Sequence, residues 1–268
     1  MSGASAVRLC VIGGGNMGDA ILGGLIDTQW CTASQIEVVE PRADARQRLE
    51  AAYGVVTAES PSVASGADFL VAVKPHYVAT VCREIGPQAT RVLSVAAGVT
   101  VASMESWLGP NTAVVRAMPN MPALVGLGAS GIAGGTRATS ADVEWASMIL
   151  GSVGIVEAVL EWQLDAVTGV SGSGPAYIFL IAEAMIEAGV LQGLPRATAV
   201  ALASQTIRGA GEMLVRNPDQ AATLRANVTS PGGTTAAGLR ALEDRAVRAA
   251  ILDAVSAATK RATELGAL

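Results

Sequence analysis

The sequence predicts a two-part α/β protein, with a doubly wound sheet in the first half of the chain and helices alone in the second. From residue 8 to about residue 159, short apolar runs alternate with helix-sized segments, the pattern of a parallel sheet covered by helices. From about residue 161 the strand-like runs stop, and apolar residues recur at helical spacing. We therefore expect a sheet domain over residues 1–162 and a helical domain over residues 163–268.

Composition narrows the possible partners. The 268 residues are 51% hydrophobic and 15% charged with a net charge of −5, so we expect a sizeable core and neither a nucleic-acid nor a membrane partner. Three cysteines and one histidine without ligand spacing argue against a metal site, and the cysteines are expected to be reduced and buried. The N-terminus lacks the pattern of a secretory signal, which predicts a cytoplasmic protein.

The first element is a strand at residues 8–12, followed by a glycine-rich turn and a helix. In this order the pattern Gly13-x-Gly15-x-x-Gly18 is a dinucleotide-binding fingerprint. The first glycine permits a tight turn, the second lets backbone approach a pyrophosphate, and the third lets the helix pack on the strand. The helix N-terminus then favours the phosphates. The alternative is a turn that simply joins a strand to a helix.

Further strands and one helix complete the predicted sheet domain. Residues 69–73 form a continuous apolar run, as expected for a strand that is covered on both faces. The other predicted strands are residues 35–39, 55–56, 92–95, 113–116 and 129–133, and residues 43–52 are a predicted helix.

The second strand ends in Glu40, about 20 residues beyond Gly18, where an acidic residue can accept hydrogen bonds from the adenosine ribose. Such a carboxylate repels a 2′-phosphate, whereas the guanidinium of Arg42 can bind one. The pair therefore favours NADH without excluding NADPH. The alternative for Glu40 is a solvated strand end.

Two more turns follow apolar strands at the same predicted edge of the sheet. Ala72-Val73-Lys74-Pro75 and Ala96-Ala97-Gly98 place small residues and a rigid proline where backbone can approach a flat ring. Lys74 faces either a phosphate or water. His76 is either a catalytic acid or an exposed residue at a helix start, and we favour the second interpretation.

The second half contains helical segments interrupted by two turns rich in Gly, Ser and Pro. We expect helices from Pro175 to a stop at Gly189, from residues 193–195 to about Arg216, and one or two helices over residues 235–265. Their apolar residues cover more than one face, which predicts a dimer interface, the alternative being a helical lid within a monomer. The turns are residues 168–177 and 227–235, and the second offers an anion nest of carboxylate size.

These motifs closely resemble those of the pyrroline-5-carboxylate reductase family over almost the whole chain. The resemblance rests on residues 12–18, 72–75, 96–100, 116–120 (Arg-Ala-Met-Pro-Asn), 169–177 and 230–235, of which the last two are highly specific together. It implies a Rossmann-like N-terminal domain, and a helical domain that interlocks with its partner in a homodimer or larger homo-oligomer. One departure is Ala226, where the family commonly has an acidic residue.

The resemblance also implies a set of site residues. NADPH or NADH would contact Ile12, Gly13, Gly14, Gly15, Asn16, Met17, Gly18, Glu40, Arg42, Ala72, Val73, Lys74, Pro75, Ala96, Ala97, Gly98 and Asn227. The substrate would contact Glu161, Thr168, Ser230, Gly233, Thr234 and Thr235, with Thr235 and Ser230 as the catalytic residues.

The implied substrate, Δ1-pyrroline-5-carboxylate, is a cyclic imine that is electrophilic once protonated, so its reduction to L-proline needs no strong protein acid. The protein would mainly position the reactants, and a hydroxyl such as that of Thr235 would orient or protonate the nitrogen. Two alternatives stay open. One is a β-hydroxyacid-type dehydrogenase, against which the absence of lysine from residues 169–177 argues. The other is a non-catalytic regulatory protein that binds a nucleotide or another cofactor. Cofactor preference, oligomer size, the proton donor and feedback by proline are left open.

Overall fold

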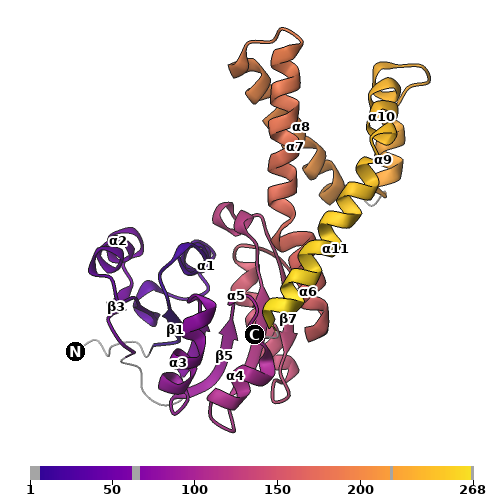
Figure 1. Cartoon of the computed structure of the whole chain (residues 1–268). Helices are drawn as coiled ribbons and strands as arrows, with labels where there is room; N and C mark the ends of the chain where they lie inside the picture. Colours follow the sequence, from indigo (N-terminus) through magenta and orange to yellow (C-terminus); the bar gives the residue numbers. More distant parts are fainter. Residues whose placement is uncertain (1–6, 62–66, 218–219, 267–268) are drawn as a thin grey trace. The chain divides into compact units, whose positions relative to one another are not determined.

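The computed structural model describes residues 7–61, 67–217 and 220–266. The chain forms two compact units, one of residues 1–173 with 256–268 and one of residues 174–255 (Figure 1). The division at residue 174 lies beyond the predicted boundary at residue 162, and the last residues of the chain return to the first unit.

The first unit is built on one eight-stranded sheet with the order β3-β2-β1-β4-β5-β6-β7-β8. From β1 the strand order runs one way to β3 and the other way from β4 to β8, and this change at β1 and β4 is typical of a doubly wound sheet. The strands are β1 (Leu9–Ile12), β2 (Ile36–Val39), β3 (Val56–Ala58), β4 (Ala67–Val71), β5 (Ala89–Ser94), β6 (Ala113–Met118), β7 (Gly128–Gly134) and β8 (Gly154–Ala158).

One prediction about this sheet is wrong. The neighbouring strands are parallel except for β6 and β7, which are antiparallel, with Ala117 opposite Ile132. Parallel neighbours need a crossover of about a dozen residues or more. The connection here holds only the short 3-10 helix η2 (Met121–Val125), so the chain turns back on itself.

Helices cover both faces of this sheet, and alternate strand residues supply the two cores. Leu9 and Val11 belong to a buried cluster with Leu22 and Trp145, whereas Cys10 and Ile12 belong to a second cluster. The two clusters lie on opposite faces because side chains alternate along a strand. The covering helices are α1 (Asn16–Asp27), α2 (Ala43–Tyr53), α3 (Pro75–Ile85), α4 (Val101–Trp107) and α5 (Ser140–Gly151). The three cysteines are buried and form no disulfide, as predicted.

Short helical turns follow the sheet. They are η3 (Glu161–Gln163), α6 (Leu164–Val167) and the π-helical turn η4 (Thr168–Gly172), and the 3-10 helix η1 (Ala33–Gln35) precedes β2. Glycines let η4 and α6 lie directly against the strands. A Cβ on Gly172 would come within 2.8 Å of the Met118 side chain, and one on Gly131 within 2.9 Å of Val167.

The second unit contains helices alone among its described residues. They are α7 (Gly174–Leu191), α8 (Arg196–Arg216), α9 (Ala221–Asn227), α10 (Thr234–Asp244) and the first part of α11 (Val247–Gly266). Helix α7 does not stop at Gly189 as predicted, because a helical glycine is tolerated where another helix comes close. A Cβ on Gly189 would lie 3.1 Å from the Cβ of Ala199 in α8, and the chain turns instead at Gly193, whose φ is +94°. Helix α9 was not predicted.

Apolar side chains of α7 are exposed within the single chain. Ile178, Phe179 and Leu180 are 44%, 52% and 67% exposed. Among the residues that the structure describes, the stretch Glu161–Leu191 contains an 18-residue window with a mean hydropathy of 1.5, and it is long and apolar enough to cross a membrane by length and composition alone. Such a surface requires a covering layer.

Candidate active site

The glycine-rich turn after β1 has the geometry that its sequence predicts. Gly13 adopts φ +105°, and a Cβ there would lie 2.7 Å from the carbonyl oxygen of Ala72. A Cβ on Gly18 would lie 2.1 Å from the carbonyl oxygen of Gly13, so only glycine allows α1 to start this close to the strand. Gly15, the N-cap of α1, differs because a Cβ there would meet nothing within 4 Å. The open side of Gly15 faces the helix N-terminus, where backbone N–H groups favour an anion.

Glu40 is part of this turn. Its side chain is buried, one carboxylate oxygen accepts the N–H of Gly14 at 3.1 Å, and the other accepts the N–H and Nε of Arg42, both at 3.1 Å. The solvated alternative for Glu40 is therefore wrong. Because both oxygens already accept hydrogen bonds, the carboxylate stabilises the turn, and the exposed guanidinium of Arg42 is the more accessible charged group.

A second ion pair ties α2 to the same turn. The guanidinium of Arg48 donates to a carboxylate oxygen of Asp19 at 2.6 Å and to the carbonyl oxygen of Gly14 at 3.3 Å. The turn is thus connected to both helices that flank β2.

A cavity of about 770 Å³ opens beside the turn at the carboxyl ends of β1, β2 and β4. It is lined by eight predicted cofactor residues, which are Ile12, Gly13, Gly15, Glu40, Arg42, Ala72, Val73 and Lys74. A cavity at this edge, next to the reversal in strand order, is where doubly wound sheets bind nucleotides.

Other residues of the cavity lining were missed by the sequence analysis. Tyr77, Thr80 and Glu84 line it from one side of α3. Their spacing of three to four residues along a helix that begins at Pro75 is the signal that could have identified them. His76 is exposed on the first turn of α3 with its ring 4.1 Å from that of Tyr77, so it is a residue of a helix start as favoured.

The remaining predicted cofactor residues of the first unit do not line this cavity. Gly14, Asn16, Met17 and Gly18 belong to the turn and the start of α1, and Pro75 starts α3. Ala96, Ala97 and Gly98 follow β5, the neighbour of β4, and Gly98 adopts φ +74°. This turn lies against the C-terminal end of α11, because a Cβ on Gly98 would be 3.4 Å from the carbonyl oxygen of Leu265.

The Ser-Pro-Gly-Gly-Thr-Thr turn belongs to the second unit. Gly232 adopts φ +69°, and a Cβ on Gly233 would lie 2.3 Å from the hydroxyl of Ser230, so the turn folds tightly onto itself. Thr234 and Thr235 are the first two residues of α10, and the half-buried Thr235 lies where the first N–H groups of the helix point outward. Asn227, the last residue of α9, is exposed.

Two predicted substrate residues lie in the first unit and make contacts that the sequence did not predict. One carboxylate oxygen of Glu161 accepts the N–H of Val101 at 2.7 Å and a guanidinium N–H of Arg116 at 3.1 Å. The hydroxyl of Thr168 donates to the carbonyl oxygen of Leu164 at 2.9 Å. Within the described ranges, no group of three or more His, Cys, Asp or Glu side chains could hold a metal ion.

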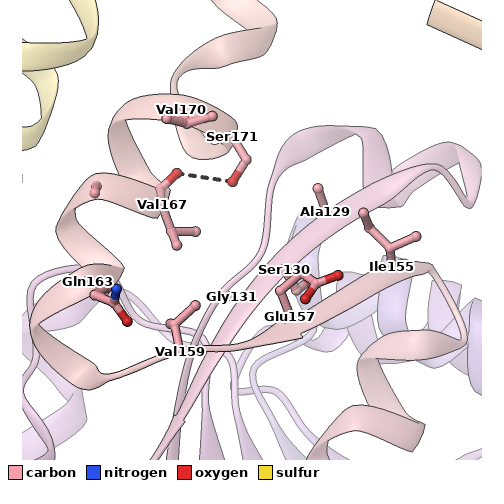
Figure 2. Close-up of a pocket in the computed structure, with 11 residues that line it drawn as sticks. Ala129, Ser130, Gly131, Ile155, Glu157, Val159, Gln163, Val167, Val170 and Ser171 are labelled. Carbon is pink, nitrogen blue, oxygen red and sulfur yellow. Dashed lines mark hydrogen bonds between the residues drawn. The ribbon is translucent and has the colours of Figure 1, made fainter. Parts of the chain in front are cut away.

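A smaller cavity of about 380 Å³ lies between the β7–β8 edge and the turns that follow (Figure 2). Ala129 and Ile155 line it from the strands, and Val167, Val170 and Ser171 line it from α6 and η4. Its wall is largely apolar.

Comparisons with known proteins decide the family. Residues 161–265 match the family model described as pyrroline-5-carboxylate reductase dimerisation, and residues 8–98 match the model described as NADP oxidoreductase coenzyme F420-dependent. A pyrroline-5-carboxylate reductase of Pseudomonas aeruginosa is 40% identical over 267 residues, which cover 97% of each chain. The chain belongs to the pyrroline-5-carboxylate reductase family.

Solved structures agree with this assignment. A pyrroline-5-carboxylate reductase of Coxiella burnetii has a TM-score of 0.92 at 37% identity, covering 97% of this chain and 99% of its own. A pyrroline carboxylate reductase of Plasmodium falciparum, solved with NADP bound, has a TM-score of 0.84 at 29% identity, covering 98% of this chain and all of its own. The resemblance drawn from the sequence motifs and the Rossmann-like fold are therefore confirmed.

Proposed function

We propose that this chain is a pyrroline-5-carboxylate reductase, which transfers hydride from NADPH or NADH to the C=N carbon of Δ1-pyrroline-5-carboxylate and forms L-proline. The observation that carries the proposal is the 40% identity to a reductase of this name over 97% of both chains. The glycine turn supports it, since its geometry is that of a dinucleotide site and not of a simple connection.

The residues present fit a nicotinamide dinucleotide. The open side of Gly15 and the N-terminus of α1 suit the pyrophosphate, and the cavity of about 770 Å³ suits the adenosine half. When bound, the cofactor supplies the hydride. The guanidinium of Arg42 forms an ion pair with the carboxylate of Glu40 and offsets its charge, which weakens the electrostatic reason to favour NADH. We propose that Arg42 binds the 2′-phosphate, that NADPH is preferred, and that the turns at residues 72–75 and 96–98 approach the nicotinamide.

For the substrate, the turn at residues 230–235 provides the small-residue nest that a carboxylate requires. Ser230, Gly233 and Thr234 hold the carboxylate, and the hydroxyl of Thr235 orients or protonates the ring nitrogen. Glu161 and Thr168 complete the substrate site in this proposal, and Asn227 contacts the cofactor. The protonated imine is already electrophilic, so positioning the reactants contributes most of the rate.

The exposed apolar face of α7 supports homo-oligomerisation through the C-terminal helices. We propose that a second copy of the chain covers this face, with residues 1–162 and 163–268 acting as the cofactor-binding and dimerisation domains. The second of these nearly coincides with residues 161–265, the segment matched by the dimerisation model. We further propose that the enzyme works in the cytoplasm, without a membrane or nucleic-acid partner.

The test is the absorbance of reduced nicotinamide, followed with NADPH and NADH side by side in the presence and absence of pyrroline-5-carboxylate. Substrate-dependent oxidation with formation of proline is expected, faster with NADPH. Cofactor binding without oxidation would indicate the regulatory protein, and oxidation only with a carbonyl substrate would indicate the hydroxyacid dehydrogenase.

The role of Thr235 has its own test. Thr235→Ala should lower kcat by about tenfold or more while cofactor binding is unchanged. Thr223→Ala, on the exposed surface of α9, is the matched control. Equal turnover in the wild type and Thr235→Ala would remove this hydroxyl from the mechanism.

A further inference from the structure

Asn120 is a buried polar residue that the proposed chemistry does not use. It follows β6 and precedes η2, and it is 8% exposed. Its amide oxygen accepts the N–H of Ala129 in β7 at 2.8 Å, and its amide nitrogen donates to the carbonyl oxygen of Ser171 in η4 at 3.0 Å. One side chain therefore joins three segments through both ends of its amide.

The turn held in this way is of an unusual kind. η4 is π-helical, closed by the N–H of Ser173 on the carbonyl oxygen of Thr168 at 2.8 Å. Single π-helical turns are rare and are frequently found at functional sites. Figure 2 shows Ser171 on this turn, with its hydroxyl donating to the carbonyl oxygen of Val167 at 3.0 Å. This hydroxyl bonds within its own helical segment, whereas the amide of Asn120 ties the backbone of Ser171 to the sheet.

The location relates this tie to the reaction. β6 pairs in parallel with β5, with Arg116 opposite Ser94, so Asn120 follows the same end of the sheet as the turn at residues 96–98. In doubly wound sheets, ligands bind at the carboxyl ends of the parallel strands. Thr168, in the proposed substrate site, is the first residue of the turn that Asn120 holds.

We infer that Asn120 is a positioning residue for imine reduction, because its two hydrogen bonds fix the position of the Thr168–Gly172 turn relative to the end of the sheet. This inference rests on the proposed function for its link to catalysis. An asparagine suits the position because a neutral amide supplies one acceptor and one donor, as the N–H of Ala129 and the carbonyl of Ser171 require. An aspartate keeps the acceptor but directs a negative oxygen at the carbonyl of Ser171.

Steady-state kinetics of two variants test the catalytic half of the inference. In Asn120→Leu and Asn120→Asp, kcat for pyrroline-5-carboxylate should fall about tenfold, while the KM for NADPH changes less than about twofold. Asn120→Asp should recover relative to the wild type as the pH is lowered, because the protonated carboxyl can again donate to Ser171. Asn217→Leu is the matched control, since its exposed amide donates to the carbonyl oxygen of Met213 at the end of α8.

Hydrogen exchange measured by mass spectrometry tests the structural half without relying on activity. Peptides that cover residues 164–176 should exchange faster in Asn120→Leu than in the wild type, and peptides from α1 should not change. Unchanged exchange over these residues, or unchanged kcat in both variants, would overturn the inference. If the wild type oxidises no cofactor in the presence of the imine, both the proposed function and the catalytic role of Asn120 are wrong. Hydrogen exchange over residues 164–176 would still show whether Asn120 holds the Thr168–Gly172 turn.

Discussion

The two compact units differ in how they bury apolar side chains. In the sheet unit, Leu9, Val11, Phe69 and Leu70 are fully buried, as the interior strands of a doubly wound sheet require. In the helical unit, the 18-residue α7 contains no buried residue, and the 21-residue α8 buries only Ala199 and Ala203. The sheet unit completes its core within one chain, whereas the helical unit does not.

This difference indicates where a second copy acts. Each fully buried large aliphatic or aromatic side chain stabilises a fold by about 1.5–3 kcal/mol, and α7 forgoes that contribution in the single chain. In the proposed dimer, a second copy would recover it by covering the helices, which agrees with the dimerisation model matched by residues 161–265. Assembly and cofactor binding should therefore respond to different substitutions.

The largest effect is expected from Gly18→Ala in the sheet unit. The new Cβ would meet the carbonyl oxygen of Gly13 at 2.1 Å, so the turn must open and the free energy of unfolding should fall by about 3 kcal/mol or more. Gly15→Ala is the control, because Gly15 has an ordinary φ of −75° and open space around it. It should keep its stability within about 0.5 kcal/mol yet bind NADPH more weakly. Chemical denaturation and cofactor titration measure the two effects, and equal stability of both variants would contradict the packing argument.

A charge on α7 should break the assembly without unfolding the sheet unit. Phe179→Asp places a carboxylate on the exposed apolar face and should raise the dimer dissociation constant about a hundredfold. Val56→Asp, at a similarly exposed residue of β3, should leave the mass of the assembly in solution unchanged. Sedimentation velocity distinguishes the two. A Phe179→Asp variant that stays fully dimeric would show that another surface forms the interface.

Within the sheet unit, Arg42→Ala should change cofactor preference. Loss of a charge-assisted contact should lower kcat/KM for NADPH about tenfold and leave that for NADH within about twofold. Arg83→Ala is the charge-matched control, since Arg83 lies on α3 outside the cavity lining. Parallel losses with both cofactors would mean that Arg42 acts only by holding Glu40.

A further effect concerns pH and again reports on the sheet unit, which contains all three cysteines. Burial raises the pKa of Cys82 to about 11. Below its ordinary pKa the thiol stays protonated in both states and stability is unaffected. Between about pH 9 and 11 the unfolded chain releases this proton and the folded chain does not, so stability should fall by up to about 1.4 kcal/mol per pH unit. Denaturation of the wild type and Cys82→Ala across this range should give a shallower slope for the variant, and identical slopes would contradict the assignment.

Much of the sheet unit was predictable because its signals are local. A glycine that needs positive φ, such as Gly13, and a run of apolar residues, such as residues 69–71, determine turn and strand through nearest neighbours. The antiparallel β7 was missed because strand direction depends on the length of a connection that contains a 3-10 turn. Among site residues, the cavity wall from α3 was missed because which face of a helix borders a cavity depends on how the helix packs on the sheet.

What the sequence by itself determined is the glycine-rich turn after β1, the alternation of strands and helices in the first half, and the small-residue turns of the second half, since these follow from local signals in the chain. Only the tertiary structure decided the partners of polar side chains. Glu40 accepts the N–H of Gly14, and the amide of Asn120 donates to the carbonyl oxygen of Ser171. Such pairs connect residues far apart in the chain, and a hydrogen bond depends on where the fold places donor and acceptor.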